Sequence, residues 1–446
     1  MKNNIKNNKG YLIGTILIFI LMFICSTRLV MSQAPDEYMR YSIPQYIMNH
    51  GTLPNGNEKE ILNAIWGFSY GFTPYLPSLI SVLFMKGVAL FTHNASYLLV
   101  AARLTSVLAG SITFFICCKI GEEIYNKKIT IYLFSIIVTL LPQFFYLSLY
   151  LNNDSFSVMT TALIVYAWIK GIKTNWQYFY CVFLGVSIGL CALTYYNAYG
   201  FILCSIFVYC ISCYQAGFDL KTFFVRGMII ALSAFIIGGW FFIRNAMIHH
   251  GDFLGMNSMY ECGEKYAQDG YQLSKRMTYE HQGIGVVSML LHTNWFIDTA
   301  KSFVCASGYM KYIISNILFV GYVLLSILGL GSTIIGLKNN YQLKFKLKPY
   351  FIICLILCML IPIVLSIKYS YSIDYQPQGR YIMSILVPLA LFISIGYEYI
   401  ANVLETKNFI KYNYSILTII IAYIVFFGLC YEKYIRLCLE NMNSII

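Results

Sequence analysis

Long apolar runs separated by short polar connections make up nearly the whole chain. The first run covers residues 11–31, and a bilayer is crossed by a helix of about 20 such residues. Later runs have the same character, so we expect about eleven transmembrane helices. The predicted spans are 11–31, 97–118, 130–150, 154–170, 177–196, 199–215, 222–243, 313–336, 349–369, 381–400 and 412–430. The pattern therefore predicts an all-α polytopic membrane protein.

One further apolar run, residues 74–92, is interpreted as a helix lying on the outer face of the membrane. It begins with two prolines and contains Lys86. Leaving it out of the membrane places most loop lysines on one side, namely Lys119, Lys127, Lys128, Lys170, Lys173, Lys221, Lys338, Lys344, Lys346, Lys348, Lys407 and Lys411. Lysine-rich loops face the cytoplasm. We therefore expect a cytoplasmic N-terminus and an external C-terminus.

Two external segments stand out within a transmembrane module of residues 1–400. The first external loop, 32–96, contains a predicted helix over residues 36–50 that lies in the membrane interface and ends at Gly51. The large external loop, 244–312, has mixed charges and is long enough to cover a cavity. Residues 401–446 add the last transmembrane helix and a short external tail.

Composition supports the membrane class and excludes several functions. Hydrophobic residues make up 59% of the chain, charged residues 11%, and the mean hydropathy is +0.65. The net charge of +12 comes from lysines and arginines spread through short loops, so no nucleic-acid partner is expected. The absence of a Walker motif and of GxGxxG at a strand-to-helix junction gives no support to an ATP-driven pump or a Rossmann domain.

The 14 cysteines lie mostly inside predicted spans and are interpreted as small apolar packing residues. Their spacing matches no structural zinc site. Cys262 and Cys305 share the large external loop, and the sequence leaves open whether they form a disulfide.

Asp36 and Glu37 form an acidic pair just after the first span. Paired carboxylates at the membrane surface can hold a divalent cation or accept a proton from an incoming hydroxyl. The alternative is that they only begin a surface helix, because acids favour helix N-termini.

Four other residues have candidate chemistry at the external ends of predicted spans. Asp154, which follows Asn152 and Asn153, could cap a helix or face a cavity, and the two roles are compatible. Arg380 could direct two donors onto a phosphate, or could anchor its helix in the interface beside Tyr381. Arg244 lies where a span meets the large loop. Arg103 lies inside a span and costs about 2.5–3.5 kcal/mol there unless it is paired or reaches the surface.

Several short motifs, taken in order, resemble the GT-C glycosyltransferases, membrane enzymes that use polyprenyl-phosphate-linked sugars. The closer resemblance is to the bacterial branch related to protein mannosyltransferases and aminoarabinose transferases. The matching segments are Pro35-Asp36-Glu37, His50-Gly51-Thr52-Leu53-Pro54, residues 70–76, residues 103–110, Asn152-Asn153-Asp154, residues 240–245 and Gln378-Gly379-Arg380-Tyr381.

The resemblance implies roles for these residues. It places catalytic acids at Asp36 or Glu37 and at Asp154, with a divalent metal such as Mg or Mn held between Asp36 and Asp154 in some members. It places the carrier phosphate at Arg380. We also assign substrate-binding roles to Arg244, Arg103, His50, Asn153 and Tyr381. Residues 244–312 match no particular member, which leaves the acceptor open.

We therefore expect a glycosyltransferase of the bacterial plasma membrane with its active site facing outside. It would transfer a sugar from a polyprenyl-phosphate-linked donor to an extracytoplasmic glycan, lipid or protein, with inversion. One alternative is a surface-polysaccharide polymerase or ligase, which would depend on basic loop residues. The other is a flippase or transporter, which would need polar groups at mid-span and inverted repeats. The spans here are nearly free of acids.

Overall fold

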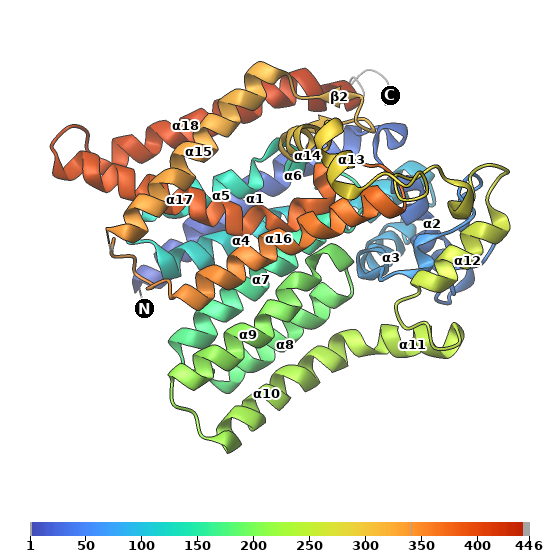
Figure 1. Ribbon diagram of the computed structural model, residues 1–446, viewed down its shortest axis with the longest axis horizontal. Helices are drawn as coiled ribbons and strands as arrows, with labels where there is room; N and C mark the ends of the chain where they lie inside the picture. The colour runs from blue at the N-terminus through green and yellow to red at the C-terminus, as the bar shows by residue number, and fades with distance from the viewer. Residues whose placement is uncertain (1, 340, 440–446) are drawn as a thin grey trace.

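The computed structural model describes residues 2–339 and 341–439 and is a bundle of long helices (Figure 1). Among these residues, nine helical segments are long and apolar enough to cross a membrane. They are α1 (Lys2–Arg28), α4 (Ala95–Ile124), α7 (Asp154–Lys173), α9 (Tyr199–Gln215), α10 continued by α11 (Leu220–Ala234 and Trp240–Ile248), α15 (Asn316–Lys338), α16 (Pro349–Ser372), α17 (Leu386–Thr406) and α18 (Tyr412–Cys430). The predicted all-α, multi-pass fold is confirmed.

Two of the eleven predicted spans are shorter helices. The run 130–150 is divided into α5 (Lys128–Thr139) and α6 (Pro142–Leu147). The chain leaves the helix before Pro142 because proline has no N–H and its ring clashes with the preceding turn. The run 177–196 contains α8 (Tyr178–Ala192), which has 15 residues.

The long helices differ in how deeply they are buried. Helices α4, α7 and α17 form the interior, whereas α10 lies at the edge of the bundle with few of its side chains buried. Phe224, Met228 and Phe235 are among the large apolar side chains exposed there. In a membrane protein such a surface faces lipid, where apolar side chains are favoured.

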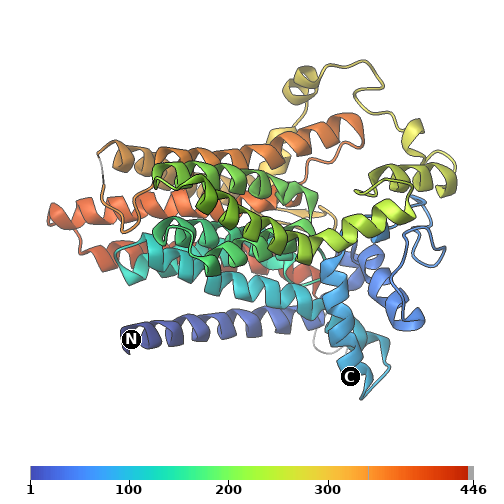
Figure 2. The ribbon, with the colours of Figure 1, turned by 90° about the horizontal axis from the view of Figure 1, so that it is seen from below.

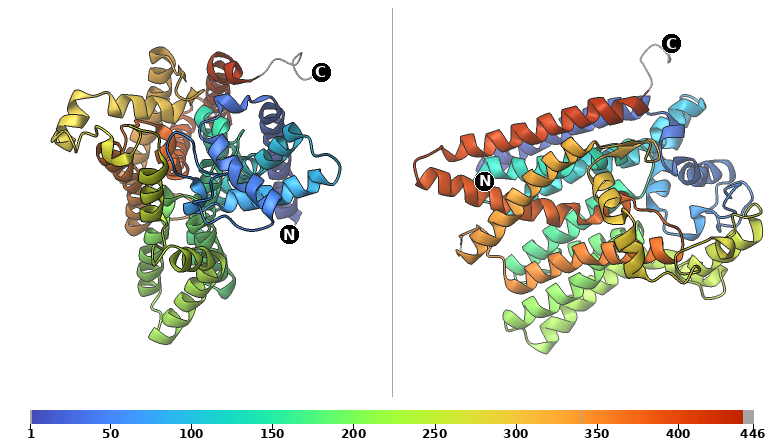
Figure 3. Two further views of the ribbon diagram at one scale, coloured as in Figure 1. Left: turned by 90° about the vertical axis from the view of Figure 1, so that its right-hand side faces the viewer. Right: turned by 45° about the horizontal axis from the view of Figure 1, so that its top comes forward.

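Extramembrane elements gather at the end of the bundle opposite the N-terminus (Figure 2). They are α2 (Glu37–His50), α3 (Leu76–Ala89), α12 (Met256–Tyr266), α13 (Val286–His292) and α14 (Trp295–Val304). Helix α3 runs crosswise to the long helices (Figure 2). Helix α2 ends at Gly51, whose φ of 71° suits glycine, as predicted from the sequence. Seen end-on, the first and large external loops lie side by side (Figure 3, left).

A short hairpin completes this end. Strands β1 (Ala306–Ser307) and β2 (Tyr312–Ile313) pair antiparallel, with Ala306 opposite Ile313. Cys262 and Cys305 are both unbridged, as are the other cysteines. The predicted external tail extends beyond residue 439, and its last part, 440–446, lies outside the described residues.

Candidate active site

A pocket of about 250 Å³ lies at the loop-bearing end of the bundle. Its wall comes from four segments that are far apart in the sequence: the first external loop, residues 143–150, the large external loop, and residues 369–381 at the end of α16 and in the turn before α17. Polar and aromatic lining residues include Asp36, Trp66, Tyr70, Tyr150, Arg276, Tyr309, Tyr369, Asp374, Gln376, Gln378, Arg380 and Tyr381. Residues 244–312 were predicted to be long enough to cover a cavity. They contribute to this wall Arg276, Ser302, Ala306, Tyr309 and Met310.

Asp36 and Arg380 form an ion pair inside this pocket. The distance between Arg380 Nη2 and Asp36 Oδ2 is 2.7 Å, and the two side chains are 12% and 24% exposed, respectively. Asp36 precedes α2 with a left-handed φ of 61°, which is uncommon for a residue other than glycine. Arg380 lies in the 3-10 turn Gly379–Ile385 that leads into α17.

The electrostatic surroundings keep Asp36 ionised. Burial acts to raise the pKa of its carboxyl, but the charges of Arg380 and Arg40 and hydrogen bonds from Arg380 and Tyr70 together hold the pKa below its ordinary value. A charged acid beside a charged base results, and both side chains line a space that a ligand can enter.

Arg40 was not selected from the sequence, although it belongs to this group. It is 8% exposed, and its Nε has no hydrogen-bond partner among the residues that the structure describes. Its guanidinium lies 4.2 Å from the centre of the Tyr70 ring, a favourable cation–π contact. The signal that could have revealed it is its position four residues after Asp36, which is one turn of a helix.

Asp154 is not among the residues that line the pocket and is 5% exposed. Within the described part of the chain, its Oδ1 has no hydrogen-bond partner, and the charges of Arg380, Arg40 and Asp36 all act on its carboxyl. It is the first residue of α7, not the cap. The capping oxygen belongs to Asn152, whose Oδ1 accepts from the N–H groups of Asp154 at 2.8 Å and Ser155 at 3.2 Å.

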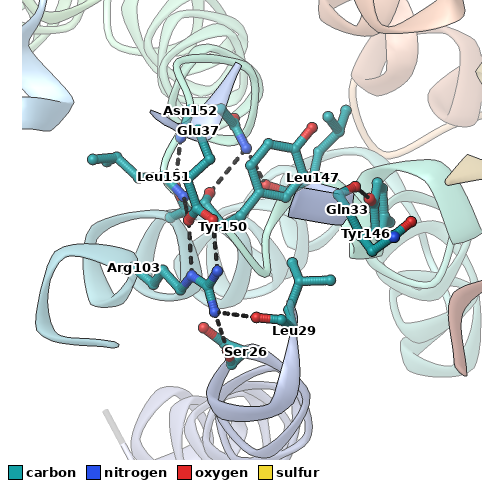
Figure 4. Close-up of polar contacts among 11 residues, drawn as sticks. Ser26, Leu29, Gln33, Glu37, Arg103, Tyr146, Leu147, Tyr150, Leu151 and Asn152 are labelled. Carbon is teal, nitrogen blue, oxygen red and sulfur yellow. Dashed lines mark hydrogen bonds and ion pairs between the residues drawn. The ribbon is translucent and has the colours of Figure 1, made fainter. Parts of the chain in front are cut away.

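Glu37 and Arg103 are not part of the pocket lining. They form a buried ion pair, with Arg103 Nη2 and Glu37 Oε2 separated by 2.6 Å (Figure 4). The structure therefore separates the two adjacent acids, because Asp36 faces the pocket while Glu37 faces the interior of the bundle.

Three further candidates make contacts outside the pocket lining. Arg244 Nη2 donates to the carbonyl of Pro54 at 2.9 Å and to Asn55 Oδ1 at 2.9 Å. His50 contacts Glu60 at 2.8 Å, and both side chains are exposed. Asn153 Nδ2 donates to the carbonyls of Pro74 and Thr194.

Tyr381 does line the pocket. Its hydroxyl donates to Gln376 Oε1 and accepts from Arg380 Nη2 at 3.2 Å. Arg380 Nε also donates to Gln378 Oε1 at 2.8 Å. These contacts fix the guanidinium plane so that it faces Asp36.

The bundle and its pocket define a polytopic membrane protein with the GT-C fold, as solved structures show. AglB, the oligosaccharyltransferase of the archaeon Archaeoglobus fulgidus, in complex with an inhibitory peptide and a dolichol-phosphate, aligns with a TM-score of 0.55 at 12% identity, over 96% of this chain and 56% of that one. The chain thus spans about half the length of this relative. ArnT from Cupriavidus metallidurans, bound to undecaprenyl phosphate, aligns with a TM-score of 0.53 at 12% identity, over 96% and 74%.

A family description also matches part of the chain. Residues 77–240 match the family of dolichyl-phosphate-mannose-protein mannosyltransferases. No curated protein matches the chain. The resemblance seen in the sequence is thus confirmed at the level of the fold.

The described residues do not form a complete protein site for a divalent metal. A structure of the archaeal oligosaccharyltransferase in complex with Zn and sulfate aligns with a TM-score of 0.54 at 13% identity, over 95% of this chain and 54% of that one. In the described part of this chain, no three His, Cys, Asp or Glu side chains converge. Arg380 already neutralises Asp36 at 2.7 Å, and hard cations prefer six or more oxygen ligands.

Proposed function

We propose that this chain is a membrane glycosyltransferase that moves a sugar from a polyprenyl-phosphate-linked donor to the hydroxyl of an extracytoplasmic acceptor. The observation that carries the proposal is the Asp36–Arg380 pair, which brings a carboxylate and a guanidinium to one pocket at the end of a transmembrane bundle. The GT-C fold supports the same class of reaction.

The proposed reaction is a single displacement with inversion at the anomeric carbon. Asp36 accepts the proton of the acceptor hydroxyl while the acceptor oxygen forms a bond to that carbon. The bond between the carbon and the phosphate oxygen breaks, and its electron pair leaves with the polyprenyl phosphate. Arg380 and Arg40 offset the negative charge that develops on the leaving phosphate. Atoms and charge balance without another reactant.

The ion pair between Asp36 and Arg380 has a direct role in this scheme. A phosphate beside Arg380 competes with Asp36 for the guanidinium, because both are anions that accept its N–H donors. Donor binding therefore releases Asp36 from part of its pairing and makes it a stronger base. Asp36, and not Glu37, is the proton acceptor we propose, since Glu37 has no contact with the pocket.

We further propose that the pocket faces the outside of a bacterial plasma membrane. The lysine-rich connections, such as those around Lys127 and Lys407, lie at the N-terminal end of the bundle, away from the pocket (Figures 1 and 2). Lysine-rich loops are retained in the cytoplasm, and the opposite end is then external.

The test uses the purified chain in nanodiscs with a panel of undecaprenyl-phosphate-linked hexoses and pentoses and a panel of hydroxyl-bearing glycan, lipid and peptide acceptors, and measures transfer of the sugar from the lipid to an acceptor. Wild-type protein should turn over at least one of them, and Asp36→Asn should lower the rate by about 10³-fold. Full turnover by Asp36→Asn, or none by wild-type protein, contradicts the proposal. The control is Asp269→Asn, which changes an exposed acid of the large loop.

A further inference from the structure

Glu37 is a fully buried carboxylate with three donors directed at it. Arg103 Nε donates to Oε1 at 2.8 Å and Arg103 Nη2 donates to Oε2 at 2.6 Å (Figure 4). The backbone N–H of Leu151 donates to Oε1 at 2.9 Å. The side chain of Glu37 is 0% exposed, and that of Arg103 is 2% exposed. Both oxygens are therefore occupied, and no substrate can reach them.

The remaining donors of Arg103 fix the end of the first transmembrane helix. Arg103 Nη1 donates to the carbonyl of Ser26 at 2.8 Å and to that of Leu29 at 2.7 Å (Figure 4). The last carbonyls of a helix have no partner within the helix and need one elsewhere. A single guanidinium thus connects α1 and α4 to the start of α2.

This pair is connected to the chain close to both acids of the candidate site. Glu37 follows Asp36 directly in the chain, and its Oε1 also holds Leu151, three residues before Asp154. The backbone of Asp36 has a left-handed φ of 61°, a conformation that persists only when surrounding contacts fix it. The contacts of Glu37, the next residue along the chain, anchor this part of the backbone to the interior of the bundle.

We propose that Glu37 and Arg103 are positioning residues that set the places of Asp36 and Asp154 relative to each other. This inference rests on the proposed function, because that function makes Asp36 the proton acceptor and gives Arg380 and Arg40, whose charges also act on Asp154, to the leaving phosphate. A displacement of about 1 Å at a reacting group can lower a rate by 10²-fold. One carboxylate that anchors both acids controls such a displacement.

A role in stability alone makes a different prediction. Breaking a buried ion pair by removing one partner is strongly destabilising, whereas replacing both partners by apolar side chains of similar size is often neutral. Stability and positioning can therefore be separated, because an apolar pair restores packing but offers no acceptor to the N–H of Leu151.

The experiment compares Glu37→Met, Arg103→Met and the double variant in nanodiscs, with the undecaprenyl-phosphate sugar that wild-type protein turns over fastest. Each single variant should lower the melting temperature, and the double variant should recover much of that loss. We expect kcat of the double variant to stay about 10- to 100-fold below wild type, with KM for the donor within about twofold. Recovery of kcat together with the melting temperature overturns the proposal, and so does a raised KM with unchanged kcat.

Glu37→Gln keeps the experiment informative where the methionine variants fail to fold. Gln retains an oxygen for Leu151 and Arg103 Nε but loses the acceptor of Arg103 Nη2, so we expect a partial loss of kcat of about tenfold. Its pH–rate profile should keep the acid limb of wild type. An acid limb displaced in Glu37→Gln, or a loss as large as that of Asp36→Asn, makes Glu37 a proton-transferring group and overturns the proposal.

A measurement that does not depend on enzyme activity distinguishes the positioning role of Glu37 from the proposed function. Hydrogen exchange at the amide of Leu151 should be slow in wild type and faster in Glu37→Gln, because the acceptor of this N–H is weakened. Unchanged exchange contradicts the positioning role even if the chain proves to have another function. Full turnover by Asp36→Asn contradicts the proposed function, whatever Leu151 does.

Discussion

Asp36 and Arg380 come from opposite ends of the chain, yet their side chains meet at 2.7 Å. Burial alone would raise the pKa of the Asp36 carboxyl and favour its protonated form. The pairing with Arg380 keeps this carboxyl ionised. At the residue scale, the site thus depends on positive charge around one acid. Arg40 supplies a second cation to it without an ion-pair partner of its own among the described residues.

The charge of Arg40 should be visible in the pH dependence of the reaction. Because the folded protein holds the pKa of Asp36 below its ordinary value, we expect the acid limb of kcat/KM below about pH 3.9, the value for a free aspartate. Arg40→Gln removes a charge that favours the carboxylate, so the pKa of Asp36 should rise because burial is less fully offset. The acid limb should therefore move to higher pH. The measurement is the pH–rate profile of each variant.

Arg436→Gln is the matched control, since Arg436 pairs with Glu432 on the exposed surface. It should leave the acid limb in place. A limb that moves equally in both variants would mean that overall charge, and not the neighbourhood of Asp36, sets the titration.

Chelation tests whether arginines or a metal stabilise the leaving phosphate. Arg380 already pairs with Asp36, and its charge also acts on Asp154, so we expect turnover to be unchanged by EDTA. Mg²⁺ or Mn²⁺ added back to the EDTA-treated protein should have no effect. A rate that falls with EDTA and returns with either ion would restore the metal site predicted from the sequence.

At the scale of elements, the position of Arg380 depends on how α14 packs against the turn before α17. Gly379 lies so close to this helix that an added Cβ would be 2.0 Å from the backbone nitrogen of Phe303. Its N–H donates to Ser302 Oγ at 2.8 Å. The large external loop therefore supports Arg380 from behind.

Gly379→Ala should disturb this support. The new methyl group cannot fit against the backbone of Phe303, so α14 or the turn must move, and Arg380 moves with the turn. We expect lower affinity for undecaprenyl phosphate, measured by binding in nanodiscs, and at least tenfold lower turnover. Gly331→Ala is the control, because nothing lies within 4 Å of its added Cβ. Equal effects of the two substitutions would contradict this account.

The sequence predicts elements better than it predicts contacts. Apolar runs long enough for a bilayer identify the spans, because membrane thickness sets their length. The break before Pro142 and the short α8 were not expected, since both depend on local backbone geometry within an apolar run. Asp36 and Arg380 could be selected because charges at the end of a span are conspicuous. The sequence could not predict that the side chains of Asp36 and Glu37 point in different directions, because this depends on the left-handed backbone of Asp36.

At the scale of the whole molecule, the connections at one end build the pocket and those at the other carry lysine. All cysteines are buried or partly buried, so a single cysteine introduced at an exposed position can report which end faces outside. Asp269 is exposed in the large loop, and Asn408 is exposed between α17 and α18 at the other end.

We predict that Asp269→Cys reacts with a membrane-impermeant maleimide in intact cells, whereas Asn408→Cys reacts only after lysis. The measurement is a mass shift of the protein on a gel. The reverse pattern would place the pocket in the cytoplasm and would contradict the proposed orientation, while wild-type protein should remain unlabelled in both conditions.

The order of synthesis gives the Asp36–Arg380 pair a further property. The ribosome releases Asp36 early, after the first helix, and Arg380 only when α16 has been made. A nascent or truncated chain that stops before residue 380 holds the carboxylate without this guanidinium. Such a fragment lacks half of the charge pair, so the competence to act on a lipid-linked donor arises only as insertion nears its end.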